Sequence, residues 1–209
     1  MRILAIDTAL KACSVGVIEG DKVLAALSEP MDRGHAERIA PMADEARRAA
    51  GITFDSIDRV VVTTGPGSFT GLRVGLAFGR AMALAVSKPC VGVSTLEALA
   101  LEGGAAGYCA GAIDTAGGVY LALYRDGEVV QPPRQFTEAE AAAVLAKFSD
   151  VVVRGPGAAP FGGEIVAAPD IACLAMLGAR RDPERYPPNP LYLRAPDAKP
   201  AARPATVVV

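Results

Sequence analysis

The tetrapeptide Ile-Asp-Thr-Ala stands at residues 6–9 and again at residues 113–116. Each copy follows a short apolar segment, typical of a buried strand, and precedes a predicted β-hairpin. Each half then continues with a predicted helix, a further strand and a Gly-Pro-Gly tripeptide, at residues 65–67 and 155–157. Self-similarity in this matched order predicts an α/β fold built by duplication of one unit.

The hydrophobic pattern around these repeats predicts the remaining elements. Pro41 is expected to kink the first helix or to begin a fresh first turn. We expect a first subdomain over residues 1–103, a second over 104–189 and an extended proline-rich tail over 190–209, with a short strand at 191–193. The expected strands are 2–6, 13–18, 22–27, 59–64, 90–93, 119–124, 128–130 and 151–154, and the expected helices are 35–50, 70–86, 95–101 and 137–148.

Composition excludes several classes of protein. The 209 residues are 51% hydrophobic, so the chain has the apolar surface for a core and is not globally disordered. A net charge of −2 excludes a strongly basic nucleic-acid wrapper but leaves room for a local basic patch. Asp7 interrupts the first apolar run too early for a signal peptide, and no run approaches the ~20 residues of a membrane span. We therefore expect a cytoplasmic protein whose four cysteines are free thiols.

The segment Gly-Pro-Gly-Ser-Phe-Thr-Gly at residues 65–71 joins a predicted strand to a predicted helix. This context suits backbone N–H groups that cradle an anion. The segment lacks the lysine of a phosphate loop and has Thr70 where a dinucleotide fingerprint needs glycine. Two interpretations remain open: Ser68 or Thr70 caps the helix after a tight turn, or the loop holds an anion or nucleotide. The candidate residues for such a site are Asp7, Thr8, Ser68, Thr70 and Arg73.

A stripe of small residues follows this loop, because Gly71, Gly75, Gly79 and Ala83 are spaced by four. Glycine in a helix costs roughly 0.5–1 kcal/mol relative to alanine, so the stripe predicts close approach of another element. The rest of this helix is also largely apolar, so one side can face its own sheet while the other needs either a helix of this chain or a second subunit, and we favour the subunit. The expected interface residues are His35, Ile39, Met42, Leu72, Gly75, Leu76, Gly79, Met82 and Ala83.

The single histidine, His35, limits the chemistry of the chain. Two histidines four residues apart on a helix share a face and hold a metal, but the residue four positions after His35 is Ile39. A hydrolase triad would need the same histidine, and no Gly-x-Ser-x-Gly elbow is present. We expect no catalytic site, no metal site and no cofactor.

Four segments of the chain resemble the TsaB (YeaZ) family. The resemblance implies the duplicated fold of actin, Hsp70 and sugar kinases, called ASKHA, with two subdomains of mixed sheets flanked by helices. This expectation agrees with the internal repeat. The segments that carry the resemblance are residues 3–9, 35–38, 65–75 and 190–194.

The same resemblance implies a function. TsaB is the non-catalytic partner of TsaD, which installs the threonylcarbamoyl group on N6 of adenosine 37 in tRNAs reading ANN codons. TsaD carries a His-x-x-x-His metal motif where this chain has His35 and Ile39, so an inactive paralogue is implied. The implied partners are TsaD, the ATPase TsaE and, when the chain is alone, a second copy bound through the helices at 35–50 and 70–86. Transfer RNA would be reached only through the complex.

Two other functions remain as alternatives. An ATP-binding kinase-like enzyme, or a metallopeptidase-like hydrolase, would use Asp7, Thr8 and the loop at 65–71, with Arg73 as a further contact. A direct tRNA-binding module would use a basic patch, although interspersed acidic residues favour an ordinary solvated helix face. The residues of that patch are Arg33, Arg38, Arg47 and Arg48.

Overall fold

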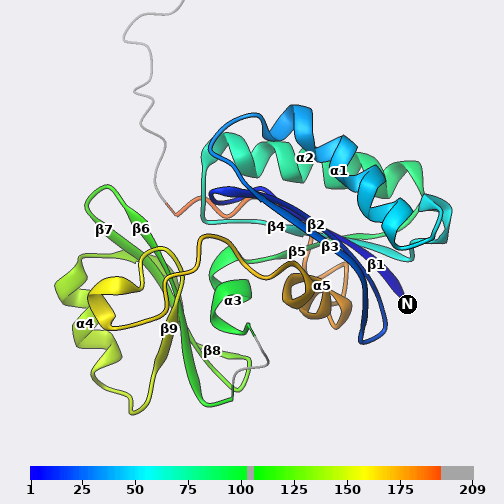
Figure 1. Cartoon of the computed structure of the whole chain (residues 1–209). Helices are drawn as coiled ribbons and strands as arrows, with labels where there is room; N and C mark the ends of the chain where they lie inside the picture. Colours follow the sequence, from blue (N-terminus) through cyan, green and yellow to red (C-terminus); the bar gives the residue numbers. More distant parts are fainter. Residues whose placement is uncertain (103–105, 194–209) are drawn as a thin grey trace, which may run out of the picture.

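The computed structural model describes residues 1–102 and 106–193, which form two α/β subdomains side by side (Figure 1). The first sheet has the strand order β3-β2-β1-β4-β5. β1 pairs antiparallel with β2 and parallel with β4, and β4 pairs parallel with β5. The strands are β1 (Arg2–Asp7), β2 (Ala12–Glu19), β3 (Lys22–Pro30), β4 (Arg59–Thr63) and β5 (Cys90–Val93).

Helices cover both faces of this sheet (Figure 1). The helices α1 (His35–Ala49) and α2 (Phe69–Ala85) lie side by side on one face, and α5 (Ile171–Ala179) lies on the other. Leu4 of β1 joins the core under α1 and α2, whereas its neighbour Ile3 joins the core under α5. Because both faces are covered, the central strands are apolar at nearly every position.

The second sheet has the order β8-β7-β6-β9, in which β6 pairs antiparallel with β7 and parallel with β9. One face carries α4 (Glu138–Leu145), and α3 (Thr95–Ala100) packs on the other face, between the two sheets (Figure 1). The strands are β6 (Tyr108–Thr115), β7 (Gly118–Arg125), β8 (Glu128–Phe136) and β9 (Val152–Arg154).

The two sheets share one plan, so the predicted duplication is confirmed. In each, the central strand ends in the repeated tetrapeptide, pairs antiparallel with the strand that follows it and pairs parallel with the strand before the Gly-Pro-Gly tripeptide. The copies differ at the acidic residue, because Asp7 is buried and Asp114 is exposed. They differ also after the tripeptide, where α2 has only a short 3-10 turn (Ala159–Phe161) as its counterpart.

The predicted subdomain boundaries need correction. The sequence analysis did not predict α5, which follows the second sheet in sequence yet packs on the first. Residues 186–193, which we call the C-terminal strap, also lie against the first subdomain, where Gly92 N donates to Tyr186 O at 2.9 Å and Leu191 N donates to Thr64 O at 2.7 Å. The strap contains no strand among residues 191–193, and the rest of the predicted tail, residues 194–209, lies outside the described residues.

Two further differences from prediction occur at segments that contain proline. Pro41 lies inside α1, which runs without a break from His35 to Ala49. β8 extends through Pro132 and Pro133 to Phe136, well beyond the predicted end at residue 130. It is the edge strand of its sheet, where the missing N–H groups are tolerated. Over the described part of the chain, no helix has the length and apolarity to cross a membrane.

Candidate functional site

Asp7 ends β1 in a fully buried position. Its Oδ1 accepts hydrogen bonds from Thr63 Oγ1 at 2.6 Å and from Ala9 N at 3.0 Å, while the buried Oδ2 has no partner among the described residues. Burial raises the pKa of Asp7, against the bonds from Thr63 and Ala9 and the charge of His35. The carboxyl group is therefore a structural element beneath the surface rather than an exposed ligand.

The loop at residues 65–71 closes tightly on the residues that follow β1. Thr8 Oγ1 donates to Gly71 O at 2.7 Å, and Ser68 N donates to Ala9 O at 2.7 Å. A Cβ atom on Gly67 would overlap the carbonyl of Ala9, so glycine is needed for this approach. The hydroxyl of Thr8 is thus engaged in a hydrogen bond within the chain.

The same loop starts α2, and Ser68 is its N-cap, accepting from Gly71 N at 3.3 Å. This confirms the capped-helix interpretation for Ser68. Thr70 and Arg73 are exposed on the first turns of α2. The five residues predicted for an anion site are therefore divided, with Asp7 and Thr8 buried and Ser68, Thr70 and Arg73 exposed.

The glycine stripe of α2 faces the sheet of its own chain, which corrects the sequence-based choice of neighbour. A Cβ atom on Gly71 would overlap Thr8 O, one on Gly75 would overlap Thr8 Oγ1 and one on Gly79 would overlap Val62 Cγ1. The close approach that the stripe predicted is present, but it joins α2 to β1 and β4. Spacing by four identifies one face of a helix and does not say whether that face points inward.

The predicted interface residues are corrected for the same reason. All of them except the half-buried Met82 are buried within this chain, so they have no surface to offer a partner without opening the core. An interface on the helix pair stays a prediction, but it needs other residues. The buried ones are His35, Ile39, Met42, Leu72, Gly75, Leu76, Gly79 and Ala83.

The exposed side of the helix pair is rich in small apolar residues, and we call it the outer face. Leu84 of α2 is 81% exposed. Half-buried Val74 and Phe78 pack against the core of the first subdomain. The outer face consists of Ala36, Ala40 and Pro41 of α1 and Ala77, Ala81, Leu84 and Ala85 of α2, all exposed.

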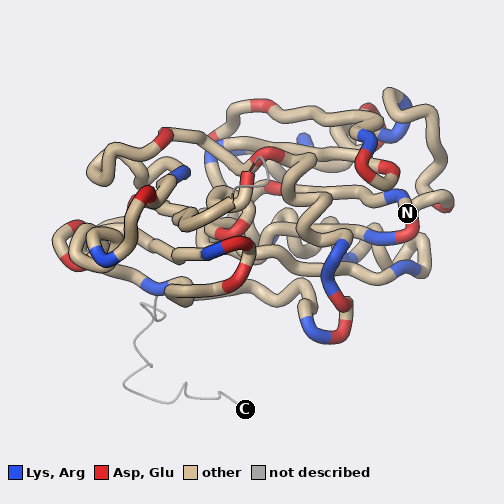
Figure 2. The backbone as a smooth tube through the Cα atoms, turned by 90° about the horizontal axis from the view of Figure 1, so that it is seen from below, with Lys and Arg blue, Asp and Glu red and all other residues tan. Residues whose placement is uncertain are grey.

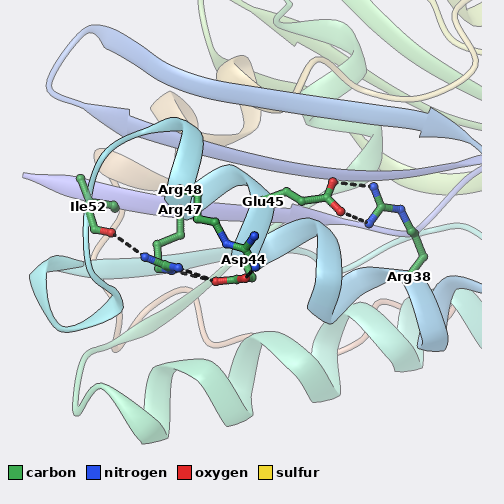
Figure 3. Close-up of polar contacts among 6 residues, drawn as sticks. All are labelled: Arg38, Asp44, Glu45, Arg47, Arg48 and Ile52. Atoms are coloured by element: carbon green, nitrogen blue, oxygen red, sulfur yellow. Dashed lines mark hydrogen bonds and ion pairs between the residues drawn. The ribbon is translucent and has the colours of Figure 1, made fainter.

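The arginines of α1 that were considered as a basic patch are paired with carboxylates, as the interspersed acidic residues led us to expect (Figure 3). Arg38 bonds Glu29 at 2.5 Å and Glu45 at 2.8 Å, and its hydrogen bonds hold the pKa of both carboxyls below the usual range. Arg47 and Arg48 both bond Asp44. Basic and acidic residues are interspersed over most of the chain in the same way (Figure 2). These arginines therefore offer little free positive charge to RNA.

Where the C-terminal strap meets α2, Arg73 lies in a cluster with two aromatic rings that the sequence analysis did not predict. The rings of Phe69 and Tyr192 have centroids 5.8 Å apart and are 57% and 48% exposed. The Arg73 guanidinium carbon lies 3.7 Å from the Phe69 ring centroid, and Arg73 Nε lies 3.5 Å from the Tyr192 hydroxyl. Since 119 positions separate Arg73 from Tyr192, no local pattern reveals the cluster.

A cavity of about 420 Å³ lies between β2, β3 and the segment before α5. Two of its polar side chains are already engaged: Ser28 bonds Ser14 at 2.8 Å, and Asp170 caps α5 by accepting from Cys173 N at 2.7 Å. Glu102 also lines the cavity, and its Oε2 is buried. Within the described ranges, no group of three His, Cys, Asp or Glu side chains gathers to hold a metal.

The two mixed sheets have the same strand arrangement around the central strand, and the glycine loop packs on the Asp-Thr turn of the first copy. These features define the ASKHA class of proteins. Comparison with solved structures agrees: YeaZ from Pseudomonas aeruginosa superposes with a TM-score of 0.76 at 25% identity, over 91% of this chain and all of that one. A second Pseudomonas aeruginosa structure, described as similar to the peptidase YeaZ, gives a TM-score of 0.77 at 26% identity, over 92% of this chain and 99% of that one.

Sequence comparison narrows this class to one family. The model for TsaD, tRNA N6-adenosine threonylcarbamoyltransferase, matches residues 27–157. The tRNA threonylcarbamoyladenosine biosynthesis protein TsaB of Escherichia coli is 39% identical over 61% of this chain and 57% of its own length, and that of Haemophilus influenzae is 37% identical over 48% and 42%. The chain thus spans about half the length of the curated relatives it matches. It belongs to the TsaD family, and within it to the TsaB (YeaZ) group.

Proposed function

We propose that this chain is a non-catalytic subunit of the machinery that forms the threonylcarbamoyl group on N6 of adenosine 37 in tRNAs reading ANN codons. It acts in the cytoplasm by binding and activating the catalytic subunit TsaD, with the ATPase TsaE as a further member of the complex. When alone, it forms a homodimer through the same surface. Membership of the TsaD family and similarity to proteins named for this biosynthesis support the proposal.

The outer face is the structural observation on which the proposal mainly depends. Exposed apolar residues gathered on a helix pair are typical of a protein interface, and Leu84 is 81% exposed. Alanines at Ala40, Ala77 and Ala81 allow another helix to approach closely. The buried glycine stripe holds α2 directly on the sheet, so the outer face is presented on a rigid base. A partner of related fold offers the matching helices, and TsaD is such a partner.

The lack of catalysis rests on the position that would hold the second metal ligand. Ile39 occupies that position on α1 and is 2% exposed, within the apolar core of the first subdomain. A kinase-like or hydrolase-like enzyme would instead need Asp7 and Thr8 to face a substrate. Both are buried, and Thr8 Oγ1 and Asp7 Oδ1 are engaged in hydrogen bonds within the chain, although Asp7 Oδ2 has no partner among the described residues. Burial keeps both side chains away from a substrate at the surface, which disfavours that alternative.

Co-elution with TsaD tests the proposal. The full chain and TsaD from the same organism are mixed and separated by size-exclusion chromatography with light scattering. Ala81→Arg places a long charged side chain on the outer face and is expected to abolish the complex. Ala142→Arg makes the same change on exposed α4 of the second subdomain and is expected to retain it.

Activity is measured as modified adenosine in tRNA digests from a reaction reconstituted with TsaD and TsaE. Formation of the modified base should require this chain and should be lost with Ala81→Arg. The proposal fails if the original chain does not bind TsaD, or if Ala81→Arg binds and activates TsaD normally. Turnover of ATP by this chain alone would favour the kinase-like alternative.

A further inference from the structure

Positive charge on and around α2 is not balanced by carboxylates. From Arg59 to Thr95 the sequence contains no Asp or Glu, although it contains Arg73, Arg80 and Lys88. Among the described residues, neither Arg73 nor Arg80 has a carboxylate within ion-pair distance, in contrast to the arginines of α1. This surface therefore keeps a charge that an anionic partner would neutralise.

The cluster of Phe69, Arg73 and Tyr192, which we call the aromatic platform, is held in place by the C-terminal strap. Leu191, the residue before Tyr192, donates its N–H to Thr64 O at 2.7 Å. Arg80 bonds the carbonyl of Pro188 in the same strap. These contacts hold the strap, and with it Tyr192, next to α2 in the absence of ligand. A ligand therefore does not have to supply the free energy of ordering this side chain.

The surroundings of the platform are polar, which distinguishes it from the outer face. Ser68 and Thr70 are exposed beside Phe69, and Asn189 is exposed on the strap. Protein hot spots are ringed by contacts that exclude water, whereas nucleic-acid interfaces are more polar and more positively charged. Half-exposed rings next to guanidinium groups are the arrangement on which unpaired bases stack.

We propose that the aromatic platform is a contact site for unpaired bases of RNA. A base stacks on the exposed ring of Tyr192 or Phe69, and Arg73 and Arg80 lie against the adjoining phosphates. The choice of RNA over single-stranded DNA rests on the proposed function. The family resemblance implied that tRNA is reached only through the complex. The proposed site adds a direct contact between this chain and RNA.

Binding of a labelled oligonucleotide tests this proposal. The probe is a fluorescein-labelled adenosine oligoribonucleotide about eight nucleotides long, alone and annealed to its complement, titrated with the full chain up to about 100 µM. The single strand is expected to bind, and Tyr192→Leu and Phe69→Leu are each expected to weaken binding about tenfold by removing a stacking ring. Arg73→Glu should weaken binding and lower the salt dependence of the affinity by about one phosphate contact.

Arg125→Glu is the matched control, because Arg125 also lies near an aromatic ring, at 5.1 Å from the centroid of Tyr108, but is paired with Asp126. It should leave RNA affinity unchanged. Thermal melting of each variant shows that the fold is retained.

Several results would overturn the proposal: no binding by the original chain, equal binding of single strand and duplex, or equal losses in Arg125→Glu and Arg73→Glu. Loss of TsaD co-elution in the platform variants with unchanged RNA affinity would assign the surface to a protein and also overturn it. Co-elution of the original chain with TsaD is measured separately, so failure of this inference leaves the proposed function standing.

Discussion

Gly79 of α2 lies directly over Val62 of β4, and a Cβ atom on Gly79 would overlap Val62 Cγ1. The preceding residue, Val61, points to the opposite face, where Gly178 of α5 lies against it in the same way. Two helices therefore reach one strand from its two faces through glycine. Both helices lie close to the sheet because neither has a side chain at the point of contact.

Gly79→Ala is expected to destabilise the fold by about 1–3 kcal/mol, because the added methyl overpacks a filled site. This cost exceeds the gain of roughly 0.5–1 kcal/mol that alanine brings to a helix interior. Urea denaturation measures the free energy of unfolding. The exposed change Ala77→Ser is the control, and Val62→Ala combined with Gly79→Ala should recover part of the loss. If Gly79→Ala is as stable as the original chain, the stripe does not face the sheet.

Asp7 predicts a specific pH dependence. Burial raises its pKa, so between the ordinary value of 3.8 and the raised folded value the folded chain binds more protons than the unfolded chain. Stability from this group therefore falls as the pH rises through that window, and the cost is fully present above the folded pKa. Asp7→Asn removes this cost. The variant should therefore be more stable than the original chain at neutral pH, and this advantage should shrink as the pH is lowered, by about 1.4 kcal/mol for each unit of pKa shift.

Urea titrations at a series of pH values check this prediction. Asp114→Asn, at the exposed equivalent position in the second copy, separates the burial of a charge from the exchange of Asp for Asn. A stability difference between Asp7→Asn and the original chain that stays constant with pH would contradict it.

The internal repeat was enough to predict the duplicated fold, because the strand, turn and hairpin signals are local. α5 was missed because its sequence, IACLAMLGA, has no polar face and hence no helical period. The inward direction of the glycine stripe was missed because it depends on Thr8 and Val62, which are distant in sequence. The Phe69 and Tyr192 pair was missed for the same reason.

Ion pairs on α1 are expected to contribute little to stability. Arg38→Met should change the free energy of unfolding by less than about 1 kcal/mol, because Glu29 and Glu45 are about half exposed and water screens them. The pKa of both carboxyls should rise toward ordinary values, which NMR titration measures. A loss of several kcal/mol would show that the ion pairs are more than surface contacts. RNA affinity should not change, since this arginine is already neutralised.

Arg80 is expected to fasten the C-terminal strap. Arg80→Ala removes its bonds to Pro188 O and to Asn189 Oδ1, so the amide hydrogens of Gly92 and Leu191, which bond across the strap, should exchange faster with solvent. Hydrogen–deuterium exchange read by NMR measures this. Lys88→Ala, which removes an exposed positive charge just after α2, is the control. Unchanged exchange at both amides in Arg80→Ala would show that the strap is held without the guanidinium.

The position of α5 has a consequence for synthesis on the ribosome. The first sheet is translated early, but the helix that covers its second face ends at Ala179. Until that helix emerges, Ile3, Ala5 and Val61 stay open to water or to chaperones. A nascent or prematurely terminated chain that ends before residue 171 therefore carries an uncovered apolar sheet, which marks it for aggregation or degradation.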